Sequence, residues 1–452
     1  MNQNITDIFI DNLIQFSKQS FSSEAILHAK KCVLDYIGVT LAGAEEYKRE
    51  EDLLLDTWLG QKGMSSVIGR YEKVSSSAAA LINGISSHAV ELDDGQRFGN
   101  IHPGAPVISA LLSIGEAKHL TFKDLWIGVL AGYECVLRLA CSIQPSHKLK
   151  GFHATGPCGT LGAAMGVAAM LNYNRSQFKS TLSTACTSAS GILEMIEGDT
   201  QLMPYNAGHA ALNGVVSASV GKAGFKYPFD ALGGNRGFLN CFSVDANLDK
   251  LVDFSGKPYY LTNYFKLYAA CGHCHSGIDA ALKMRSQDLF SIEDIESIDV
   301  ETYKLAIQGH DHNVIDGVNS AKMSIPYSVA VALLKGTAGL AEYNEAAIKD
   351  ENVLKLTSKV TVKENESITK QAPAKRISVV TVNTHSGRYS ERVDFPKGQP
   401  ENPLSIDEII MKYRDCAKYS GLSDRKIQRI EELVLEADYN QSISDLMFLL
   451  SR

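Results

Sequence analysis

Hydrophobic residues near the start of the chain recur every three or four positions. They fall at Ile5, Ile8, Phe9, Leu13 and Phe16, and again at Ile26, Ala29, Val33 and Ile37. This spacing places them on one face of an α-helix, whereas a half-buried strand would alternate polar and apolar residues. The opening segment is therefore predicted to be helical.

Small residues dominate the next part of the chain. Between Ser75 and Gly224 the sequence is rich in Ala, Gly and Ser, as in LGAAMGVAAML and LSTACTSASGI. Small side chains let helices approach one another closely. We expect a compact all-helical core in this part of the chain.

The pattern changes after about Asn263, where short runs alternate polar and apolar residues. These runs are Ile298–Val300, Val360–Val362 and Ile377–Val382, and the last leads through His385-Ser386-Gly387 into a further run that ends at Phe395. Alternation of this kind predicts a small sheet with a hairpin. Helices are predicted at Ile278–Met284, Ser328–Leu334 and Glu342–Ile348.

Helical signals return after the Pro396–Pro400 segment. Ser405 and Glu408 form a capping box, and Ile406, Ile409, Ile410 and Tyr413 form an apolar stripe. The predicted fold is mainly α. One all-helical domain is formed by both ends of the chain, residues 1–262 and 396–452, and a smaller α/β domain, residues 263–395, is inserted between them.

Composition excludes several classes of protein. The 452 residues carry a net charge of −7, and the 44 basic residues form no long run, so we expect no nucleic-acid partner. No apolar run reaches the roughly 18 residues that a membrane helix needs, so no membrane span is expected. The N-terminus lacks a secretory pattern and the nine cysteines form no framework, which predicts a cytoplasmic protein with reduced thiols.

Some motifs suggest cofactors that the rest of the sequence does not support. Cys271-Gly272-His273-Cys274-His275 matches the C-x-x-C-H pattern of haem attachment, but we find no export signal and no second pair of metal ligands at fixed spacing. A thiol redox role and a buried turn with inert cysteines stay open, and no metal is predicted. The string GVVSASVGKA, residues 214–223, lacks P-loop spacing, and Gly156, Gly159 and Gly162 do not form a dinucleotide motif.

Candidate chemistry concentrates in residues 87–104. This stretch holds the carboxylates Glu91, Asp93 and Asp94 together with Arg97, His88 and His102. Carboxylates can act as bases, and a histidine can donate or accept a proton near neutral pH. The alternative is a solvated loop in which Arg97 forms an ion pair with Asp93 or Asp94.

Two further positions carry weaker signals. His153 precedes a small-residue helix whose free N–H groups favour an anion, although a lone histidine is more often a satisfied core residue. Lys266 lies among aromatic residues, where desolvation would lower its pKa toward use as an acid or base.

Taken together, these strings resemble the MmgE/PrpD family, which includes 2-methylcitrate dehydratase, cis-aconitate decarboxylase and iminodisuccinate epimerase. The resemblance covers nearly the whole chain. It rests on KCVLDYIGVTLAG, HAVELDDGQRFGNIHPGAPVISALL, GFHATGPCGTLGAAMGVAAMLN, NAGHAALNGVVSASVGKAGF with GGNRGF, FKLYAACGHCHSGIDAAL and AKMSIPYSVAVALL, in this order.

The resemblance implies a homodimer in which the α/β domain acts as a lid and the active site lies in the cleft between the two domains. It implies no organic cofactor and no iron–sulfur cluster. His102, His153, Lys266 and Tyr327 match positions that look catalytic in the decarboxylase members.

The chain departs from the decarboxylase pattern at three positions. Glu91 stands where the decarboxylase has Asp, Gly95 stands where it has Thr, with one extra residue before His102, and Met203 stands where it has Lys. The missing lysine would bind a substrate carboxylate or transfer a proton. Its absence favours a smaller or less charged substrate than cis-aconitate.

The expected reaction forms a carbanion or enediolate beside a carboxylate. The predicted catalytic residues are His102, His153, Lys266, Tyr327 and Asp93, and the predicted binding residues are Glu91, Asp94, Arg97, His275 and Met203. The cations would neutralise carboxylates, while Asp93 and Asp94 orient them or act as base. A lyase acting on a small di- or tricarboxylate is expected. An epimerase, a metal-binding protein using Cys271, Cys274 and His275, and an inactive family member are the alternatives.

Overall fold

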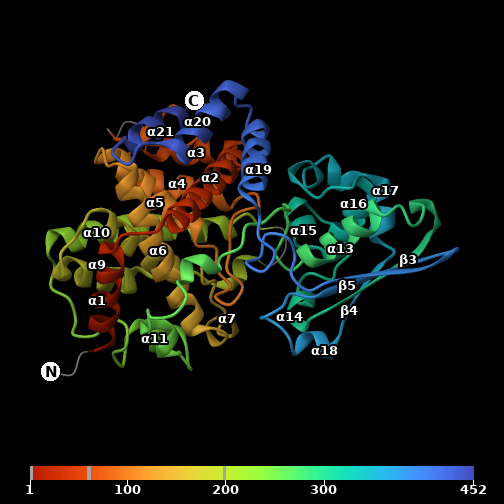
Figure 1. Cartoon of the computed structure of the whole chain (residues 1–452), viewed down its shortest axis with the longest axis horizontal. Coiled ribbons are helices and arrows are strands. Elements are labelled where there is room, and N and C mark those ends of the chain that lie inside the picture. Colours follow the sequence, from red (N-terminus) through yellow and green to blue (C-terminus); the bar gives the residue numbers. More distant parts are fainter. Residues whose placement is uncertain (1–3, 59–62, 197–199, 452) are drawn as a thin grey trace.

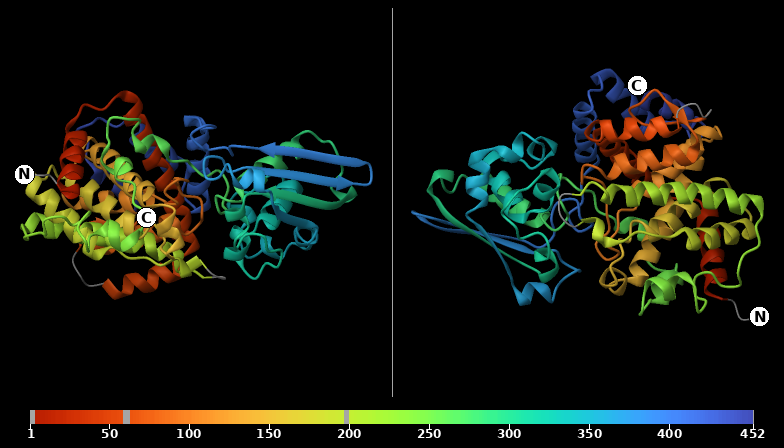
Figure 2. Two further views of the ribbon diagram at one scale, coloured as in Figure 1. Left: turned by 90° about the horizontal axis from the view of Figure 1, so that it is seen from below. Right: turned by 180° about the vertical axis from the view of Figure 1, so that it is seen from behind.

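Two lobes lie side by side in the computed structural model, which describes residues 4–58, 63–196 and 200–451 (Figure 1). Helices α1–α12 and α19–α21 make up the lobe that we call the helical body. Helices α13–α18 and strands β3–β6 make up the α/β lobe. The two lobes remain distinct when the molecule is seen from below and from behind (Figure 2).

The helical body takes its elements from both ends of the chain. They are α1 (Ile5–Lys18), α2 (Ser23–Glu46), α3 (Lys48–Trp58), α4 (Ser76–His88), α5 (Gly104–Ala117), α6 (Phe122–Ile143), α7 (Ser146–Leu149), α8 (Pro157–Met170), α9 (Arg175–Ser188), α10 (Met203–Ala223), α11 (Phe238–Phe242), α12 (Leu248–Val252), α19 (Ile406–Tyr419), α20 (Asp424–Glu436) and α21 (Ile443–Leu450), with short strands β1 (Ser65–Ser66) and β2 (Lys73–Val74). The mainly α fold class is confirmed.

One hydrophobic core joins the two ends of the chain. Its buried residues run from Phe9 to Phe265 and resume from Leu404 to Leu450, so the C-terminal helices complete the core that the N-terminal helices begin. A second core runs from Tyr268 to Val382, within the α/β lobe, and includes a few residues of the body. The domain limits at 262/263 and 395/396 stay a prediction.

Close helix packing in the body depends on the small residues. A Cβ at Gly208 of α10 would lie 2.3 Å from the carbonyl oxygen of Leu81 on α4, and one at Gly162 of α8 would lie 2.5 Å from Cβ of Val136 on α6. Both separations are too short for real atoms. The small residues at these positions therefore set the distance between the helices.

Helix α6 is long and apolar enough to cross a membrane, which the short apolar runs of the sequence did not lead us to expect. Its most apolar window is 94% buried inside the body. Glu134 and Arg138 form a buried ion pair on the same helix, with Nε and Oε1 2.7 Å apart. These surroundings are those of a core helix.

The α/β lobe contains a four-stranded sheet in the order β4-β3-β5-β6. Its elements are α13 (His275–Ser286), β3 (Ile295–Thr302), α14 (Lys304–Ile307), α15 (Val318–Met323), α16 (Ile325–Lys335), α17 (Glu351–Thr357), β4 (Val360–Glu364), α18 (Glu366–Thr369), β5 (Ser378–Thr384) and β6 (Gly387–Val393). Strand β3 pairs parallel with β4 and antiparallel with β5, and β5 and β6 form the predicted hairpin.

One predicted helix of this lobe is wrong. Residues 342–348 hold parts of two 3₁₀ turns, Leu340–Glu342 and Ala347–Lys349, and the α-helix begins only at Glu351. The side chain of Asn344 accepts hydrogen bonds from the backbone N–H groups of Ala346 and Ala347. This local bonding competes with helix formation, and the apolar spacing alone could not reveal it.

Candidate active site

A small polar cavity lies between the two lobes. The helical body lines it with Glu91, His102, Lys148, His153 and Met203, among others, and the segment from Tyr264 into the α/β lobe contributes Lys266, Cys271, His273, His310 and Arg376. Its volume is about 110 Å³. This is below the range of roughly 300–1,000 Å³ that is typical of pockets for drug-sized ligands, so the cavity suits a small molecule.

The loop between α4 and α5 forms one wall of the cavity. Asp94 fixes this loop, because its carboxylate accepts hydrogen bonds from the Gly104 N–H, the Tyr133 hydroxyl and the Asn263 amide. Burial and the nearby Asp35 and Asp93 raise the pKa of Asp94 to about 7. Asp94 therefore holds the wall in place from behind and does not line the cavity.

Gly95 brings Lys266 to this wall. Its N–H and C=O exchange hydrogen bonds of 3.0 and 2.7 Å with the backbone of Tyr264, two residues before the lysine. A Cβ at position 95 would lie 2.5 Å from the Tyr264 hydroxyl oxygen. Tyr264 therefore occupies the space that a larger residue at position 95 would need, which gives a physical reason for the glycine that departs from the decarboxylase pattern.

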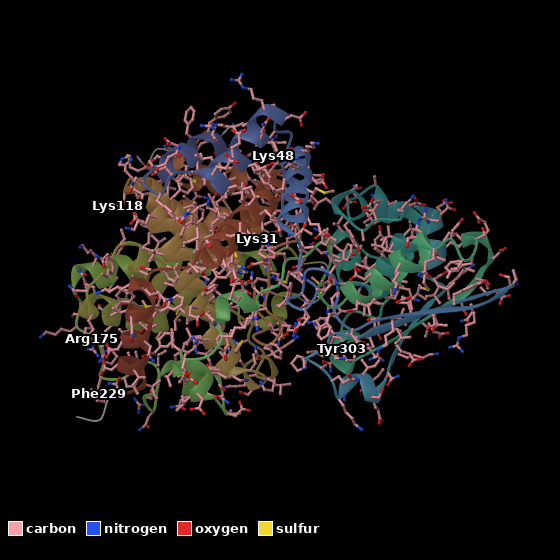
Figure 3. All side chains as sticks on the ribbon, in the orientation of Figure 1. Lys31, Lys48, Lys118, Arg175, Phe229 and Tyr303 are labelled. Atoms are coloured by element: carbon pink, nitrogen blue, oxygen red, sulfur yellow. The ribbon has the colours of Figure 1, made fainter. Side chains whose placement is uncertain are left out.

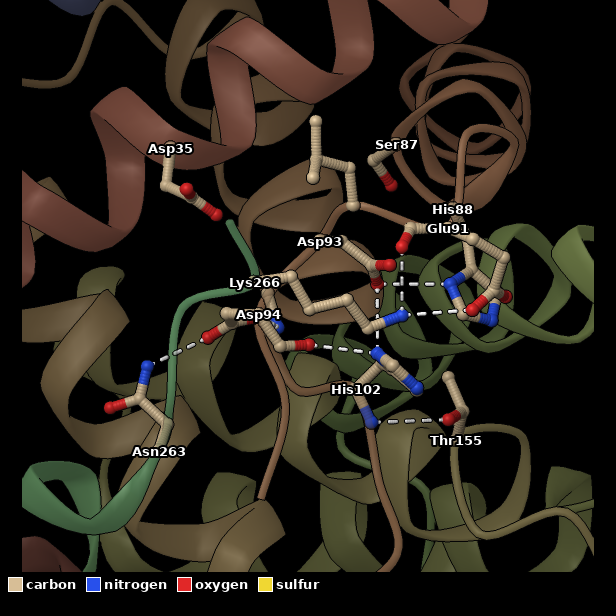
Figure 4. A network of polar contacts seen from close by, with 12 residues as sticks. Asp35, Ser87, His88, Glu91, Asp93, Asp94, His102, Thr155, Asn263 and Lys266 are labelled. Atoms are coloured by element: carbon tan, nitrogen blue, oxygen red, sulfur yellow. Dashed lines mark hydrogen bonds and ion pairs between the residues drawn. The ribbon is translucent and has the colours of Figure 1, made fainter. Parts of the chain in front are cut away.

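Lys266 and Glu91 form a buried ion pair in the cavity wall (Figure 4). The ammonium donates to Glu91 Oε2 at 2.8 Å and to the Glu91 carbonyl oxygen at 3.0 Å. Burial opposes the charge of both groups, but their attraction is stronger, so the pKa of Glu91 falls to about 2 and that of Lys266 rises above its ordinary value. The expected lowering of the lysine pKa is therefore wrong. Lys266 is a permanent cation, and one of its three N–H groups remains for a ligand.

Asp93 fixes the orientation of two histidine rings, His88 and His102. Its Oδ2 lies 2.9 Å from Nδ1 of His88 and 3.2 Å from Nδ1 of His102, which also lies 2.8 Å from the Asp94 carbonyl oxygen (Figure 4). Burial opposes the carboxylate, but the two histidines lower the pKa of Asp93 well below its ordinary value. Both partners of His102 Nδ1 are acceptors, so this nitrogen carries the proton, and Nε2 of the neutral ring is an unprotonated base.

His153 presents the opposite tautomer. Its Nδ1 lies 3.2 Å from the amide nitrogen of Asn206, which can only donate, so the neutral ring carries its proton on Nε2. Burial lowers the pKa of His153 to about 3, and the neighbouring His88 and His102 add to this shift. The cavity thus offers an acceptor nitrogen on His102 and a donor nitrogen on His153.

Two further cations line the cavity, and the sequence did not reveal them. Lys148 lies on the short helix α7, and burial lowers its pKa. Arg376 precedes β5, and its guanidinium lies 5.4 Å from the centre of the Tyr264 ring. The one sequence feature that could have pointed to Lys148 is its position five residues before the candidate His153. No sequence feature pointed to Arg376, because only the folding of the α/β lobe brings this residue to the cavity.

Some predicted residues lie away from the cavity. Arg97 pairs with Glu401 and Gln399 instead of Asp93 or Asp94, and it does not line the cavity. The Tyr327 hydroxyl donates to the carbonyl oxygen of Glu342, inside the α/β lobe. His275 bonds through Nε2 to the carbonyl oxygen of Ala270, 3.1 Å away. None of these three residues lines the cavity, and the roles predicted for them stay predictions.

The residues of the C-x-x-C-H string lie in two different environments. Cys271 faces the cavity, whereas Cys274 and His275 are buried at the start of α13. The ligand-type side chains that gather around Cys271 are His273 and His310, with one donor atom of each within 4.8 Å of the others. The set of Cys271, Cys274 and His275 considered from the sequence is not brought together.

Comparisons with known proteins agree with this architecture. Residues 11–251 match the MmgE/PrpD N-terminal domain, and residues 268–437 match the MmgE/PrpD C-terminal domain. The chain is 25% identical to the cis-aconitate decarboxylase-like protein oryM of Aspergillus oryzae, over 99% of this chain and 97% of that protein. It is also 25% identical to a cis-aconitate decarboxylase of Aspergillus terreus, over 95% of this chain and 92% of that protein. With both domains matched in order, the chain belongs to the MmgE/PrpD family.

Proposed function

We propose that this protein is a lyase that eliminates water or carbon dioxide from a small di- or tricarboxylate. One observation carries the proposal: Lys148, Lys266 and Arg376 converge on a small cavity in which, among the described lining residues, Glu91 is the sole carboxylate. Glu91 is already paired with Lys266. The remaining positive charge favours an anion with more than one carboxylate.

The two histidines supply the proton chemistry. Nε2 of His102 takes the proton from a carbon next to a carboxylate, and Lys266 stabilises the negative charge that develops on the carboxylate oxygens. His153 donates a hydrogen bond from Nε2 to the same oxygens or to the leaving group. In a dehydration the departing hydroxide receives the proton from the His102 imidazolium, so the histidine returns to its neutral form.

Decarboxylation would use the same cations differently. The bond to the carboxylate breaks, its electron pair stays on carbon as an enediolate beside a second carboxylate, and a proton that His102 takes up from solvent and passes to this carbon completes the product. The names of the Aspergillus relatives favour this branch. Met203 lines the cavity without a charge, but Lys148 and Arg376 provide two other cations for a polycarboxylate.

Epimerisation is the second candidate, and the pair of histidines supports it. An acceptor on His102 and a donor on His153 face one cavity, as a reaction needs when one group removes a proton and another returns it. No group leaves the substrate in this case. The same residues therefore support both candidates, and only the product distinguishes them.

Proton NMR in D₂O is the test. Purified protein is incubated with citrate, 2-methylcitrate, cis-aconitate and four-carbon hydroxy and imino dicarboxylates. Loss of water or carbon dioxide from one of them, absent with a His102→Gln variant, is the expected result. Deuterium entering carbon without loss of a group would replace the lyase by the epimerase, and no change across the panel would contradict both.

Lys148 gives a prediction about substrate binding. Replacing it with Gln should raise KM by about 10-fold or more, with a smaller change in kcat, since a charged hydrogen bond contributes roughly 1.5–3 kcal/mol. Steady-state kinetics on the substrate found above measures both constants. Lys150→Gln is the matched control, because Lys150 bonds to the Cys241 carbonyl oxygen instead of lining the cavity. Equal effects of the two changes would contradict a role for Lys148 in binding.

A further inference from the structure

The end of the cavity inside the α/β lobe carries a second cluster of side chains that the proposed reaction does not use. Cys271 and His273 come from the loop before α13, and His310 follows α14. Cys271 Sγ lies 3.8 Å from His310 Nε2, and one donor atom of each of the three residues lies within 4.8 Å of the others. All three side chains line the cavity.

We propose that Cys271, His273 and His310 form a binding site for a borderline-soft divalent metal ion, with zinc as the best match. Thiolate and imidazole ligands select zinc and similar ions, whereas calcium and magnesium prefer oxygen. Ligand distances of about 2.3 Å for Zn–S and 2.0–2.1 Å for Zn–N place sulfur and nitrogen about 3.6 Å apart in a tetrahedral site. The observed 3.8 Å is close to this separation.

Each histidine is oriented by a contact at its other nitrogen. Nδ1 of His310 donates to the Met323 carbonyl oxygen at 2.9 Å, which leaves Nε2 unprotonated on the side of Cys271. Nδ1 of His273 lies 2.6 Å from the hydroxyl oxygen of Tyr303, which can accept a hydrogen bond from the Nδ1–H group. Tyr303 lies at the edge of the α/β lobe next to the helical body (Figure 3). Carbonyl and hydroxyl partners of this kind fix the tautomer that binds a metal ion.

Three protein ligands leave one position of a tetrahedral ion open. Because the three residues line the cavity, this position faces the space where the substrate would bind, and a water or a carboxylate can occupy it. Three ligands with an open position are typical of zinc sites that contact a small molecule, whereas structural zinc is usually held by four protein ligands. The site stands on its own geometry and does not require the proposed lyase activity.

Cobalt substitution tests the site directly. The full-length protein is treated with a chelator, dialysed and titrated with Co²⁺ alone and then with Zn²⁺ alone. We expect one ion per chain, a thiolate-to-cobalt charge-transfer band in the near ultraviolet, and displacement of cobalt by zinc. Zinc should also protect Cys271 from alkylation by iodoacetamide, as followed by mass spectrometry of the peptide.

Matched variants separate this site from other thiols. Cys271→Ser should abolish the charge-transfer band, and His310→Ala should weaken zinc binding at least 10-fold. Cys274→Ser is the control, since Cys274 belongs to the same string but is buried away from the cavity. This variant should bind cobalt and zinc as the unchanged protein does. The absence of the charge-transfer band in the unchanged protein, loss of the band in Cys274→Ser alone, or alkylation of Cys271 that zinc does not slow would each overturn the proposal.

Discussion

Replacing Lys266 with Met is expected to lower kcat/KM by at least about 10³-fold. The lysine is a fully buried cation in the cavity wall, and its charge would stabilise the carbanionic intermediate. Removal of one such group from an enzyme typically costs about 10²–10³-fold in rate. Here the change also leaves the buried carboxylate of Glu91 without its partner, so an anionic substrate meets an added negative charge. Kinetics on the NMR-identified substrate measures the loss.

Loss of stability must be separated from loss of activity in this variant. Breaking a buried ion pair by removing one partner typically costs about 3–5 kcal/mol. Arg138→Met is the matched control, because Arg138 and Glu134 form an equally buried pair that does not line the cavity. Both variants should lose stability in urea titration, and the folded fraction of Arg138→Met should keep its activity.

A double variant completes the test. Adding Glu91→Gln to Lys266→Met removes the unpaired charge, so stability should return in part while activity stays low. Recovery of activity together with stability would show that Lys266 acts only on the fold. Activity of the folded Lys266→Met protein within 10-fold of the unchanged protein would contradict the proposed role of the cation.

Much of the fold can be predicted from the sequence, because apolar spacing and capping residues depend on neighbouring positions in the chain. The Ser405 and Glu408 capping box marks the start of α19, and the alternation through Ile377–Val382 and on toward Phe395 marks the hairpin of β5 and β6. Residues 342–348 show where such signals fail. There the Asn344 side chain bonds to the backbone nearby, which apolar spacing does not record.

In the candidate site, too, residues that are close in sequence could be predicted, whereas residues placed by distant contacts could not. Glu91, Asp93 and His102 lie within 12 residues of one another and come together through the α4–α5 loop. Arg97 lies in the same string, yet it pairs with Glu401, 304 positions away, and does not line the cavity. Arg376 enters the cavity from a distant segment without any motif of its own. Charged residues placed by tertiary contacts are therefore the part of the site that one sequence does not reveal.

Replacing His102 with Gln is expected to lower kcat by about 10²–10⁴-fold, the usual contribution of a positioned acid or base. Glutamine keeps a polar side chain of similar length but offers no group that can take a proton near neutral pH. Exchange of the substrate's carbon-bound hydrogen in D₂O should stop as well, since this exchange reports proton removal alone. NMR follows turnover and exchange in the same sample.

The pH dependence of kcat/KM gives a second signature of His102. Burial lowers the pKa of His102 despite the opposing charge of Asp93, so the neutral base dominates near pH 7 and activity should fall only as the pH drops through this lowered pKa. Lys266 stays charged over the same range, because its pKa is raised. His28→Gln is the control: His28 is another histidine whose pKa burial lowers, to about 4, but it bonds to Asn263 and does not line the cavity. If His102→Gln keeps proton exchange and the same acidic limb, while His28→Gln loses them, the base is not His102.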